Sequence, residues 1–347
     1  MTDSTLLSEI HEQPAVLRRL LREREGAVRN VAGALAGRGI TSVVIAARGS
    51  SDNAARYAQY VLGARNGINV GLATPSLFTR YLTPPRLHGA LVIGISQSGE
   101  SPDLVAVVEE GRRQGCPTLA ITNVEGSPIS RAADHTLPLG AGTERSIAAT
   151  KTYTAQLMTI AMLSAALGGD DRRWSELAEV PDQVSEVLKL GEQALAAAEV
   201  LKDAGHGVMI GRGYNYATAF EVSLKAKELA YVAVEPYSAA DFQHGPMALV
   251  ETGFAAAVVN VAGAVSQEVE ALLRAMVERG ARPAVLSNLP SSLSLAAAPL
   301  PLPEGLPEWL SPIAAVVPGQ LLAFHLSRLR GFDPDQPRGL KKVTKTT

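Results

Sequence analysis

Residues 92–101 read Val-Ile-Gly-Ile-Ser-Gln-Ser-Gly-Glu-Ser, and this stretch decides the predicted fold. The apolar run ends at Ser96, and helical periodicity begins at Asp103. We therefore predict a buried strand that passes through a glycine-bearing turn into a helix. The first backbone N–H groups of a helix have no partner within it, and the helix dipole is positive at that end, so the turn suits an anion.

The side chains of this turn strengthen the prediction of a phosphate site. Ser96, Gln97, Ser98 and Ser101 can all donate hydrogen bonds, and Gly99 lets the backbone approach a ligand closely. Helix capping by one serine is the alternative, but it does not account for four polar residues within six positions. The motifs of nucleotide-binding loops are absent from this turn and from the turn after the preceding strand.

The order of strand, turn and helix recurs on both sides of this stretch. Strands are expected at 42–46, 90–95 and 118–122, and helices at 5–36, 53–63, 102–114, 150–167 and 175–203. Continuous apolar strands that alternate with helices indicate a parallel sheet covered on both faces. Ser50, Ser51 and Asn53 follow the first strand and could supply a second group of donors at the same edge of the sheet.

Matching segments indicate that the chain is duplicated. The matches pair 45–49 with 209–213, 119–123 with 284–288, and 156–157 with 320–321, at offsets of 164 or 165. Three matches in the same order, at offsets that differ by one residue at most, predict an α/β protein of two tandem, doubly wound parallel-sheet domains with helices on both faces. In the second copy the aligned strand end reads Val-Val-Asn-Val-Ala at 258–262, without hydroxyls. Only the first copy is therefore expected to hold phosphate.

The duplication and the polar stretch 168–173, read as a linker, give the expected organisation. We expect an amino-terminal helical segment at 1–40, a first domain that binds phosphate at 41–169, a second domain at 170–330, and a carboxyl-terminal tail at 331–347.

Composition excludes several classes of protein. The chain has 347 residues, a formal net charge of −2 and 46% hydrophobic residues, so it lacks the basic character of a nucleic-acid-binding domain. No apolar run is long enough to span a membrane, and the amino terminus does not resemble a secretory signal, so we expect a cytoplasmic protein. The single cysteine, Cys116, excludes an internal disulfide and a cysteine-based zinc site. No His, Asp or Glu spacing suggests any other metal site.

Three further segments contain candidate catalytic residues. Glu221, Lys225 and Glu228 share one helix face, which is consistent with a general base and its neighbours or with a solvated face of ion pairs. His244 precedes Gly-Pro on a predicted loop and could transfer protons, or it could be an ordinary loop histidine. Lys342 lies in a basic tail that could simply be solvated.

The motifs together resemble the sugar isomerase (SIS) domain family, and in particular the isomerase half of glucosamine-6-phosphate synthase. The resemblance covers nearly the whole chain, from 9–14 to the tail. The matching motifs are 96–101, Gly142-Thr143-Glu144, Ala149-Thr150-Lys151, His244-Gly245-Pro246 and Asp335-Gln336-Pro337-Arg338.

The resemblance implies roles for individual residues and requires no cofactor. Glu228 matches the proton-transfer glutamate, and Glu221 and Lys225 match its neighbours. His244 matches the ring-opening histidine, which in the family reaches the partner subunit, so a homodimer with composite sites is implied. Lys342 matches a lysine that forms a Schiff base with the ketose. Arg48 departs from the synthase pattern, which has a smaller residue there. The implied sugar-phosphate contacts are Gly49, Ser50, Ser51, Ser96, Gln97, Ser98 and Ser101, with backbone contacts from Ile147 and Ala148.

The resemblance also implies a reaction. The glutaminase domain of the synthase has no counterpart in this sequence, so the chain is expected not to take ammonia from glutamine by itself. It then resembles stand-alone SIS deaminases, which convert glucosamine 6-phosphate to fructose 6-phosphate and ammonia. The alternatives are a fructosamine-6-phosphate deglycase, an ammonia-dependent isomerase of the synthase type, and a non-catalytic sugar-phosphate sensor.

Overall fold

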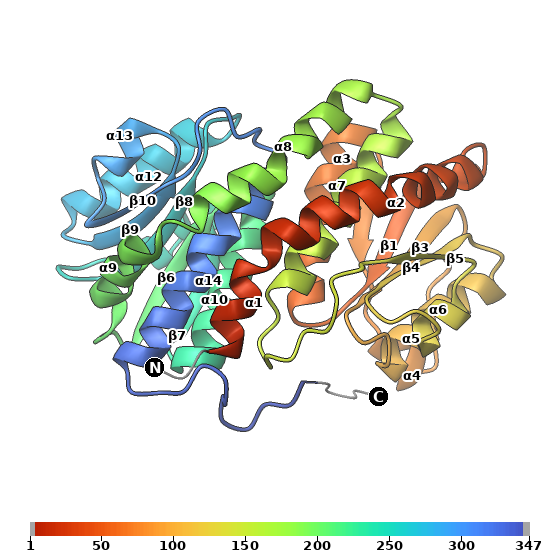
Figure 1. Cartoon of the computed structure of the whole chain (residues 1–347), viewed down its shortest axis with the longest axis horizontal. Helices are drawn as coiled ribbons and strands as arrows, with labels where there is room; N and C mark the ends of the chain where they lie inside the picture. The colour runs from red at the N-terminus through yellow and green to blue at the C-terminus, as the bar shows by residue number, and fades with distance from the viewer. Residues whose placement is uncertain (1–3, 343–347) are drawn as a thin grey trace. The chain divides into compact units, whose positions relative to one another are not determined.

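The structure is a computed structural model that describes residues 4–342, and it contains two five-stranded parallel sheets (Figure 1). The strand order is β2-β1-β3-β4-β5 in the first sheet and β10-β9-β8-β6-β7 in the second. When the second order is reversed, the two sheets have the same topology, since β7, β6, β8, β9 and β10 follow one another as β2, β1, β3, β4 and β5 do. The predicted fold class and the predicted duplication are confirmed.

The first copy begins with a strand and a helix, continues through the strand and helix that flank the turn 97–101, and ends with a long apolar helix. Its elements are β1 Ser42–Ala46, α3 Ser50–Asn66, β2 Asn69–Leu72, α4 Ser76–Thr79, β3 Ala90–Ser96, α5 Pro102–Arg113, β4 Thr118–Thr122, α6 Pro128–Ala132, β5 His135–Pro138 and α7 Lys151–Gly168, preceded by α1 Thr5–His11 and α2 Gln13–Leu35.

The second copy repeats this order after two connecting helices. Its elements are α8 Asp171–Val187, α9 Gly191–Leu201, β6 His206–Gly211, η1 Gly213–Asn215, α10 Tyr216–Ala230, β7 Ala233–Ser238, α11 Ala239–Gln243, η2 Pro246–Leu249, β8 Ala255–Asn260, α12 Ser266–Glu278, β9 Arg282–Ser287, α13 Pro290–Leu293, β10 Ala298–Pro301 and α14 Ser311–Leu329.

Three details of the predicted elements are wrong. The single helix expected at 5–36 is two helices, α1 and α2, which Glu12 separates. The stretch expected as a linker at 168–173 already contains the start of α8, at Asp171. The single helix expected at 175–203 is two helices, α8 and α9, which a turn at 188–190 separates. The polar residues at the start of α8 are ordinary for a helix terminus, since Asp171 lies in the first turn, where a negative charge is favourable.

The centre of the first copy is β3, and its packing fixes the turn that follows it. All seven residues of Ala90–Ser96 are buried. Helix α5 lies close to this strand because Gly111 has no side chain, and a Cβ at that position would come within 2.7 Å of Val92. The apolar contacts between β3 and α5 include the buried side chains of Val92, Val107 and Val108. The turn 97–101 is therefore held at both ends by packed elements.

The described chain forms two compact units, each built mainly on one copy. The first-copy unit comprises 15–144, 151–178 and the tail from Lys341, and the second-copy unit comprises 1–14, 145–150 and 179–340. In the second-copy unit, Asp335 caps helix α1, since its carboxylate accepts hydrogen bonds from the backbone N–H groups of Leu6 at 2.8 Å and Thr5 at 3.1 Å.

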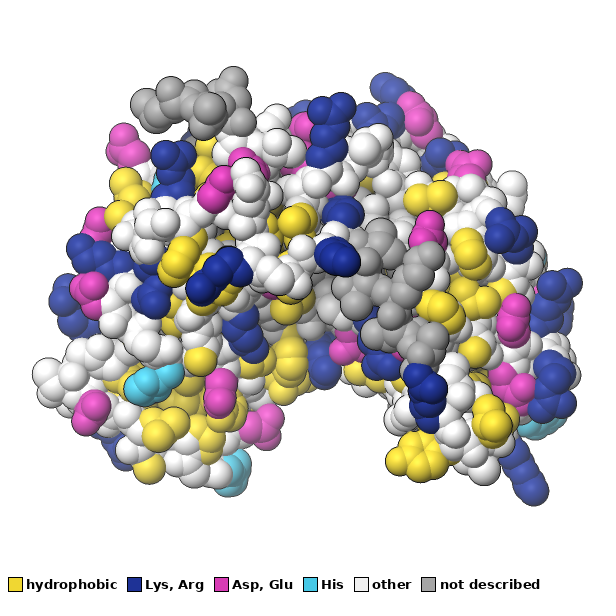
Figure 2. Space-filling model, turned by 90° about the horizontal axis from the view of Figure 1, so that it is seen from below, with side chains coloured by type: hydrophobic (Ala, Val, Ile, Leu, Met, Phe, Trp, Pro, Cys, Tyr) yellow, Lys and Arg dark blue, Asp and Glu magenta, His cyan; other side chains and the backbone are white. Residues whose placement is uncertain are grey.

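Charges of both signs are interspersed with apolar side chains on the face that Figure 2 shows. Among residues 4–342, no helix has the length and the apolar character that a membrane span requires.

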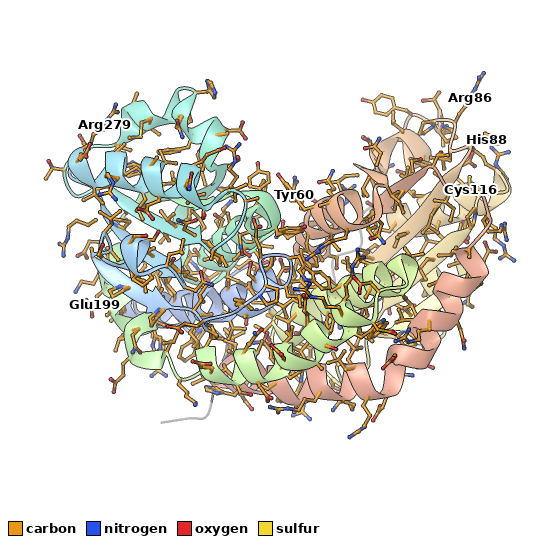
Figure 3. All side chains as sticks on the ribbon, turned by 90° about the horizontal axis from the view of Figure 1, so that it is seen from above. Tyr60, Arg86, His88, Cys116, Glu199 and Arg279 are labelled. Atoms are coloured by element: carbon orange, nitrogen blue, oxygen red, sulfur yellow. The ribbon has the colours of Figure 1, made fainter. Side chains whose placement is uncertain are left out.

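Cys116 belongs to the core of the first copy, and its Sγ donates to the carbonyl of Leu87 at 3.0 Å (Figure 3). Burial raises the pKa of this thiol.

Candidate active site

The turn after β3 folds onto its own side chains. The hydroxyl of Ser96 accepts a hydrogen bond from the N–H of Gly99 at 3.0 Å, and the hydroxyl of Ser98 accepts one from the N–H of Glu100 at 3.3 Å. Gly99 has a φ of +67°, and a Cβ there would collide with the side chain of Ser127, so glycine is needed for two reasons. The turn is a compact loop of N–H groups and hydroxyls before the start of α5.

Helix capping does not account for the serines of this turn. Ser101 occupies the N-cap position of α5, but its side chain makes no capping hydrogen bond. Ser98 bonds within the turn and not to the helix. The hydroxyls of Ser98 and Ser101 therefore do not cap helix α5, and their role in binding phosphate stays a prediction.

A second turn lies at the same edge of the first sheet. Strands β1 and β3 are parallel neighbours, with Ala46 paired to Gly94, so the turns that follow them lie side by side. Gly49 begins α3 with a φ of +54°, and Ser51 is buried and accepts a hydrogen bond from the Gln156 side chain at 3.0 Å. The predicted phosphate contacts from the two turns therefore share one sheet edge.

Arg48 joins the two turns. Its Nη2 and Nε lie 2.8 and 3.0 Å from one carboxylate oxygen of Asp103, a buried residue in the first turn of α5. The Arg48 side chain remains 51% exposed, so it is accessible from solvent at this edge of the sheet. Nearby, burial raises the pKa of Asp52, although Arg56 at 3.2 Å opposes the shift. The departure from the synthase pattern at position 48 thus adds a cation beside the predicted phosphate site.

Glu144 belongs to the matching motif 142–144, but its partners in the fold were not predicted from the sequence. Its carboxylate is fully buried and accepts hydrogen bonds from the backbone N–H of Thr152 at 3.1 Å and from the Thr152 hydroxyl at 2.7 Å. Nζ of Lys342 lies 2.7 Å from Oε2 of Glu144, the same oxygen that accepts from the Thr152 hydroxyl. The interpretation of Lys342 as part of a solvated tail does not hold, because its side chain is only 25% exposed. Residues 343–347 lie outside the described chain.

The three ionic residues of α10 lie together, as their spacing predicts. Lys225 Nζ lies 2.6 Å from Oε2 of Glu228 and 3.4 Å from Oε1 of Glu221. Glu221 and Lys225 are buried, whereas the side chain of Glu228 is 23% exposed. The alternative of a solvated face laced by ion pairs is therefore wrong. A buried ammonium thus holds one buried carboxylate, Glu221, and one partly exposed carboxylate, Glu228.

Lys225 should be essential for stability because it neutralises a fully buried carboxylate. We expect Lys225→Met to lower the free energy of unfolding by about 3–5 kcal/mol, since the buried carboxylate of Glu221 would lose its ammonium partner. Thermal unfolding of the purified chain measures this loss. The control is Lys202→Met, which breaks the exposed pair of Lys202 with Glu199 at the periphery (Figure 3) and should leave the unfolding temperature unchanged. Equal unfolding temperatures for the two variants would contradict the assignment.

The segment with the predicted backbone contacts is anchored by Glu9, whose partners in the fold were not predicted from the sequence either. The buried carboxylate of Glu9 accepts hydrogen bonds from the N–H of Arg145 at 2.6 Å and of Ser146 at 3.1 Å, and it also contacts the Ser146 hydroxyl. That hydroxyl lies 3.1 Å from the carbonyl of Ala148. The loop that carries Ile147 and Ala148 is thus held by helix α1, within the second-copy unit.

His244 is the C-cap residue of helix α11, and it is exposed to solvent. Its backbone N–H donates to the carbonyl of Asp241 at 3.0 Å, and Gly245 follows with a φ of +127°, which favours glycine. The exposed imidazole is accessible for proton transfer. Within the described residues, no group of three or more His, Cys, Asp or Glu side chains could hold a metal ion.

The candidate residues therefore divide between the two compact units. The first-copy unit brings together the two turns with their serines, and it also holds the pair of Glu144 and Lys342. The second-copy unit holds the α10 cluster, the loop with Ile147 and Ala148, and His244.

Comparison with known proteins gives this arrangement a family. The sequence model of the SIS domain matches residues 38–166 and 200–327, one match for each copy. The chain belongs to the SIS domain family. The glutamine–fructose-6-phosphate aminotransferase of Thermococcus kodakarensis is 36% identical over an alignment that covers 97% of this chain and 57% of that protein. The chain thus spans little more than half the length of that relative.

Solved SIS structures agree with both the fold and the family. The carboxyl-terminal domain of the Francisella tularensis glucosamine-fructose-6-phosphate aminotransferase is 25% identical, with a TM-score of 0.86, over 96% of this chain and 98% of that one. A structure described as a putative phosphosugar isomerase, from Silicibacter pomeroyi, is 29% identical, with a TM-score of 0.84, over 96% of this chain and the whole of that one. The predicted resemblance to SIS proteins and to the aminotransferase isomerase half is confirmed.

Proposed function

We propose that this SIS protein is an amino-sugar phosphate isomerase that releases ammonia, and that it converts glucosamine 6-phosphate to fructose 6-phosphate. One observation carries the proposal: the chain combines a glycine- and serine-rich turn before a helix with a partly exposed carboxylate, Glu228, held by a buried ammonium. A sensor needs the first feature but has no use for a buried ammonium beside a reactive carboxylate. The names of the aminotransferase relatives support the substrate class, since both contain fructose 6-phosphate.

The proposed chemistry assigns a proton transfer to each accessible group. His244 transfers a proton to the ring oxygen and opens the sugar to its aldehyde. Glu228 removes the hydrogen from C2 and returns a proton to C1, which leaves an imine at C2. Water adds to this imine, the C–N bond breaks, and ammonia leaves with the ketone of fructose 6-phosphate. One water is consumed for each ammonia released, so no oxidant or cofactor is required.

The chain's own cysteine supports release of ammonia rather than its production from glutamine. A glutaminase of the cysteine type needs an accessible thiolate, whereas Cys116 is buried and donates to a backbone carbonyl. Burial also raises the pKa of Cys116, which disfavours the thiolate. These 347 residues would therefore exchange the amine with free ammonia.

In the proposed reaction, Lys342 is the amine that binds the ketose carbonyl. Nucleophilic lysines act through a free amine, and Nζ of Lys342 is held by Glu144 at 2.7 Å. We propose that Glu144 positions Lys342 and releases it when the ketose binds.

The test is ammonia release by the purified chain from a panel of 6-phosphorylated amino sugars and fructosamines. We expect glucosamine 6-phosphate to give equal amounts of ammonia and fructose 6-phosphate. Cleavage of a fructosamine phosphate alone would replace the proposal with a deglycase. Synthesis of glucosamine 6-phosphate from fructose 6-phosphate and ammonium, without the reverse reaction, would indicate the synthase-type isomerase. Tight binding of sugar phosphates with no turnover would indicate a sensor.

A further inference from the structure

The second copy keeps the backbone plan of the phosphate turn without its hydroxyls. Strand β8 ends at Asn260, 164 positions after Ser96, and α12 begins at Ser266. At the same offset, Gly263 corresponds to Gly99 and Ala264 corresponds to Glu100. The strand registers agree with this correspondence, since β8 pairs with β9 as β3 pairs with β4. The turn between β8 and α12 is therefore the counterpart of the loop that we assign to phosphate.

A carboxylate of the chain itself occupies this second turn. Oε2 of Glu308 accepts a hydrogen bond from the backbone N–H of Ala264 at 3.0 Å. A Cβ on Gly263 would collide with the Glu308 carboxylate, and a Cβ on Gly213, the counterpart of Gly49, would lie 3.8 Å from its Oε1. The carboxylate thus lies against both glycine-bearing turns of the second copy, where an anion would bind.

The counterpart of Glu308 in the first copy has a different set of partners. Glu144 stands 164 positions before Glu308, and it accepts its hydrogen bonds from Thr152 and Lys342. The position that corresponds to Thr152 is Val316, whose side chain has no donor. A Cβ on Gly99 would meet Ser127 and Ile129 first, and one on Gly49 would meet no atom within 4 Å, so Glu144 does not occupy its own turns as Glu308 does. This difference leaves the first turn open to a ligand and fills the second.

We propose that the second copy retains an anion site and that Glu308 is its built-in ligand. The site would accept a small carboxylate or oxyanion in place of the missing side chain once Glu308 is removed. In the native chain, the same contact excludes a sugar phosphate from the second copy, so that each chain has one open phosphate site. This inference concerns the second turn alone and stands whether or not the proposed reaction is correct.

The test is chemical rescue of the full chain by acetate. We expect Glu308→Ala to lower the unfolding temperature by about 2–4 °C, because the Ala264 N–H loses a charged acceptor. Acetate, exchanged for chloride at constant ionic strength, should restore most of this loss with a saturable dependence. Glu308→Gln should not respond to acetate, because its amide still fills the site. Glu304→Ala is the matched control, since this exposed residue of the same segment should leave the unfolding temperature and its response to acetate unchanged.

A local readout keeps the test independent of global stability. With ¹³C-carbonyl glycine and ¹⁵N-alanine, only amides of Gly-Ala pairs give a selective NMR signal, and Ala264 belongs to one such pair. Its signal, assigned with Ala264→Ser, should move in Glu308→Ala and return on addition of acetate. The proposal is overturned if acetate leaves this signal unchanged in Glu308→Ala, or if it stabilises all four proteins equally.

Discussion

Glu228→Gln is expected to lower kcat for glucosamine 6-phosphate by about 10²–10⁴-fold, which is the usual worth of a general acid–base group. The amide has nearly the size and shape of the carboxylate but cannot accept the C2 proton. Lys225 loses one partner but keeps Glu221, so the fold should be retained. Coupled ammonia release under saturating substrate measures the change.

Two features make this prediction specific. The KM should change little, because the phosphate contacts that we propose lie in the turns of the first copy and not on α10. Glu199→Gln, an exposed carboxylate in an i,i+3 pair with Lys202, provides the control and should keep the wild-type rate. A Glu228→Gln protein that turns over at the wild-type rate would remove Glu228 from the mechanism.

The second large effect is expected in the phosphate turn. Replacing Ser98 and Ser101 by alanine should raise the KM for glucosamine 6-phosphate by about tenfold or more for each hydroxyl. A hydrogen bond to a charged group is worth about 1.5–3 kcal/mol, and 1.4 kcal/mol is a factor of ten. Steady-state kinetics against Ser294→Ala, an exposed serine of the second copy, measures this effect.

The unphosphorylated sugar completes this experiment. Glucosamine should be a poor substrate of the wild-type chain, and the two serine substitutions should hardly change its kcat/KM. If glucosamine and its 6-phosphate were used equally well, the turn after β3 would not be a phosphate site.

Local patterns explain why much of this protein could be predicted from its sequence. The apolar run that ends at Ser96 and the offset of 164 between matching segments led to two doubly wound copies, and the structure has them. Glu221, Lys225 and Glu228 could be placed on one face because helical spacing is a property of neighbouring residues. Helix boundaries were less accurate, since the polar residues at the start of α8 resemble those of a linker.

Residues whose partners are distant in the sequence could not be predicted in this way. Glu9 bonds to a loop 136 positions away, and Glu144 contacts Lys342 across 198 positions. Both carboxylates lie in segments that match the family, at 9–14 and 142–144, but no local pattern in these segments identifies their distant partners. Glu308 is a similar case, because its role depends on which N–H group its carboxylate meets in the folded second copy.

The most direct test of the central claim follows the C2 hydrogen of glucosamine 6-phosphate labelled with deuterium at C2. The proposal predicts that the purified chain releases ammonia and forms fructose 6-phosphate in equal amounts, with the deuterium transferred to C1 or lost to solvent. Glu228→Gln should leave the label at C2 of bound, unreacted substrate. The account is contradicted if the wild-type chain binds the substrate and the deuterium remains at C2, or if ammonia appears without fructose 6-phosphate.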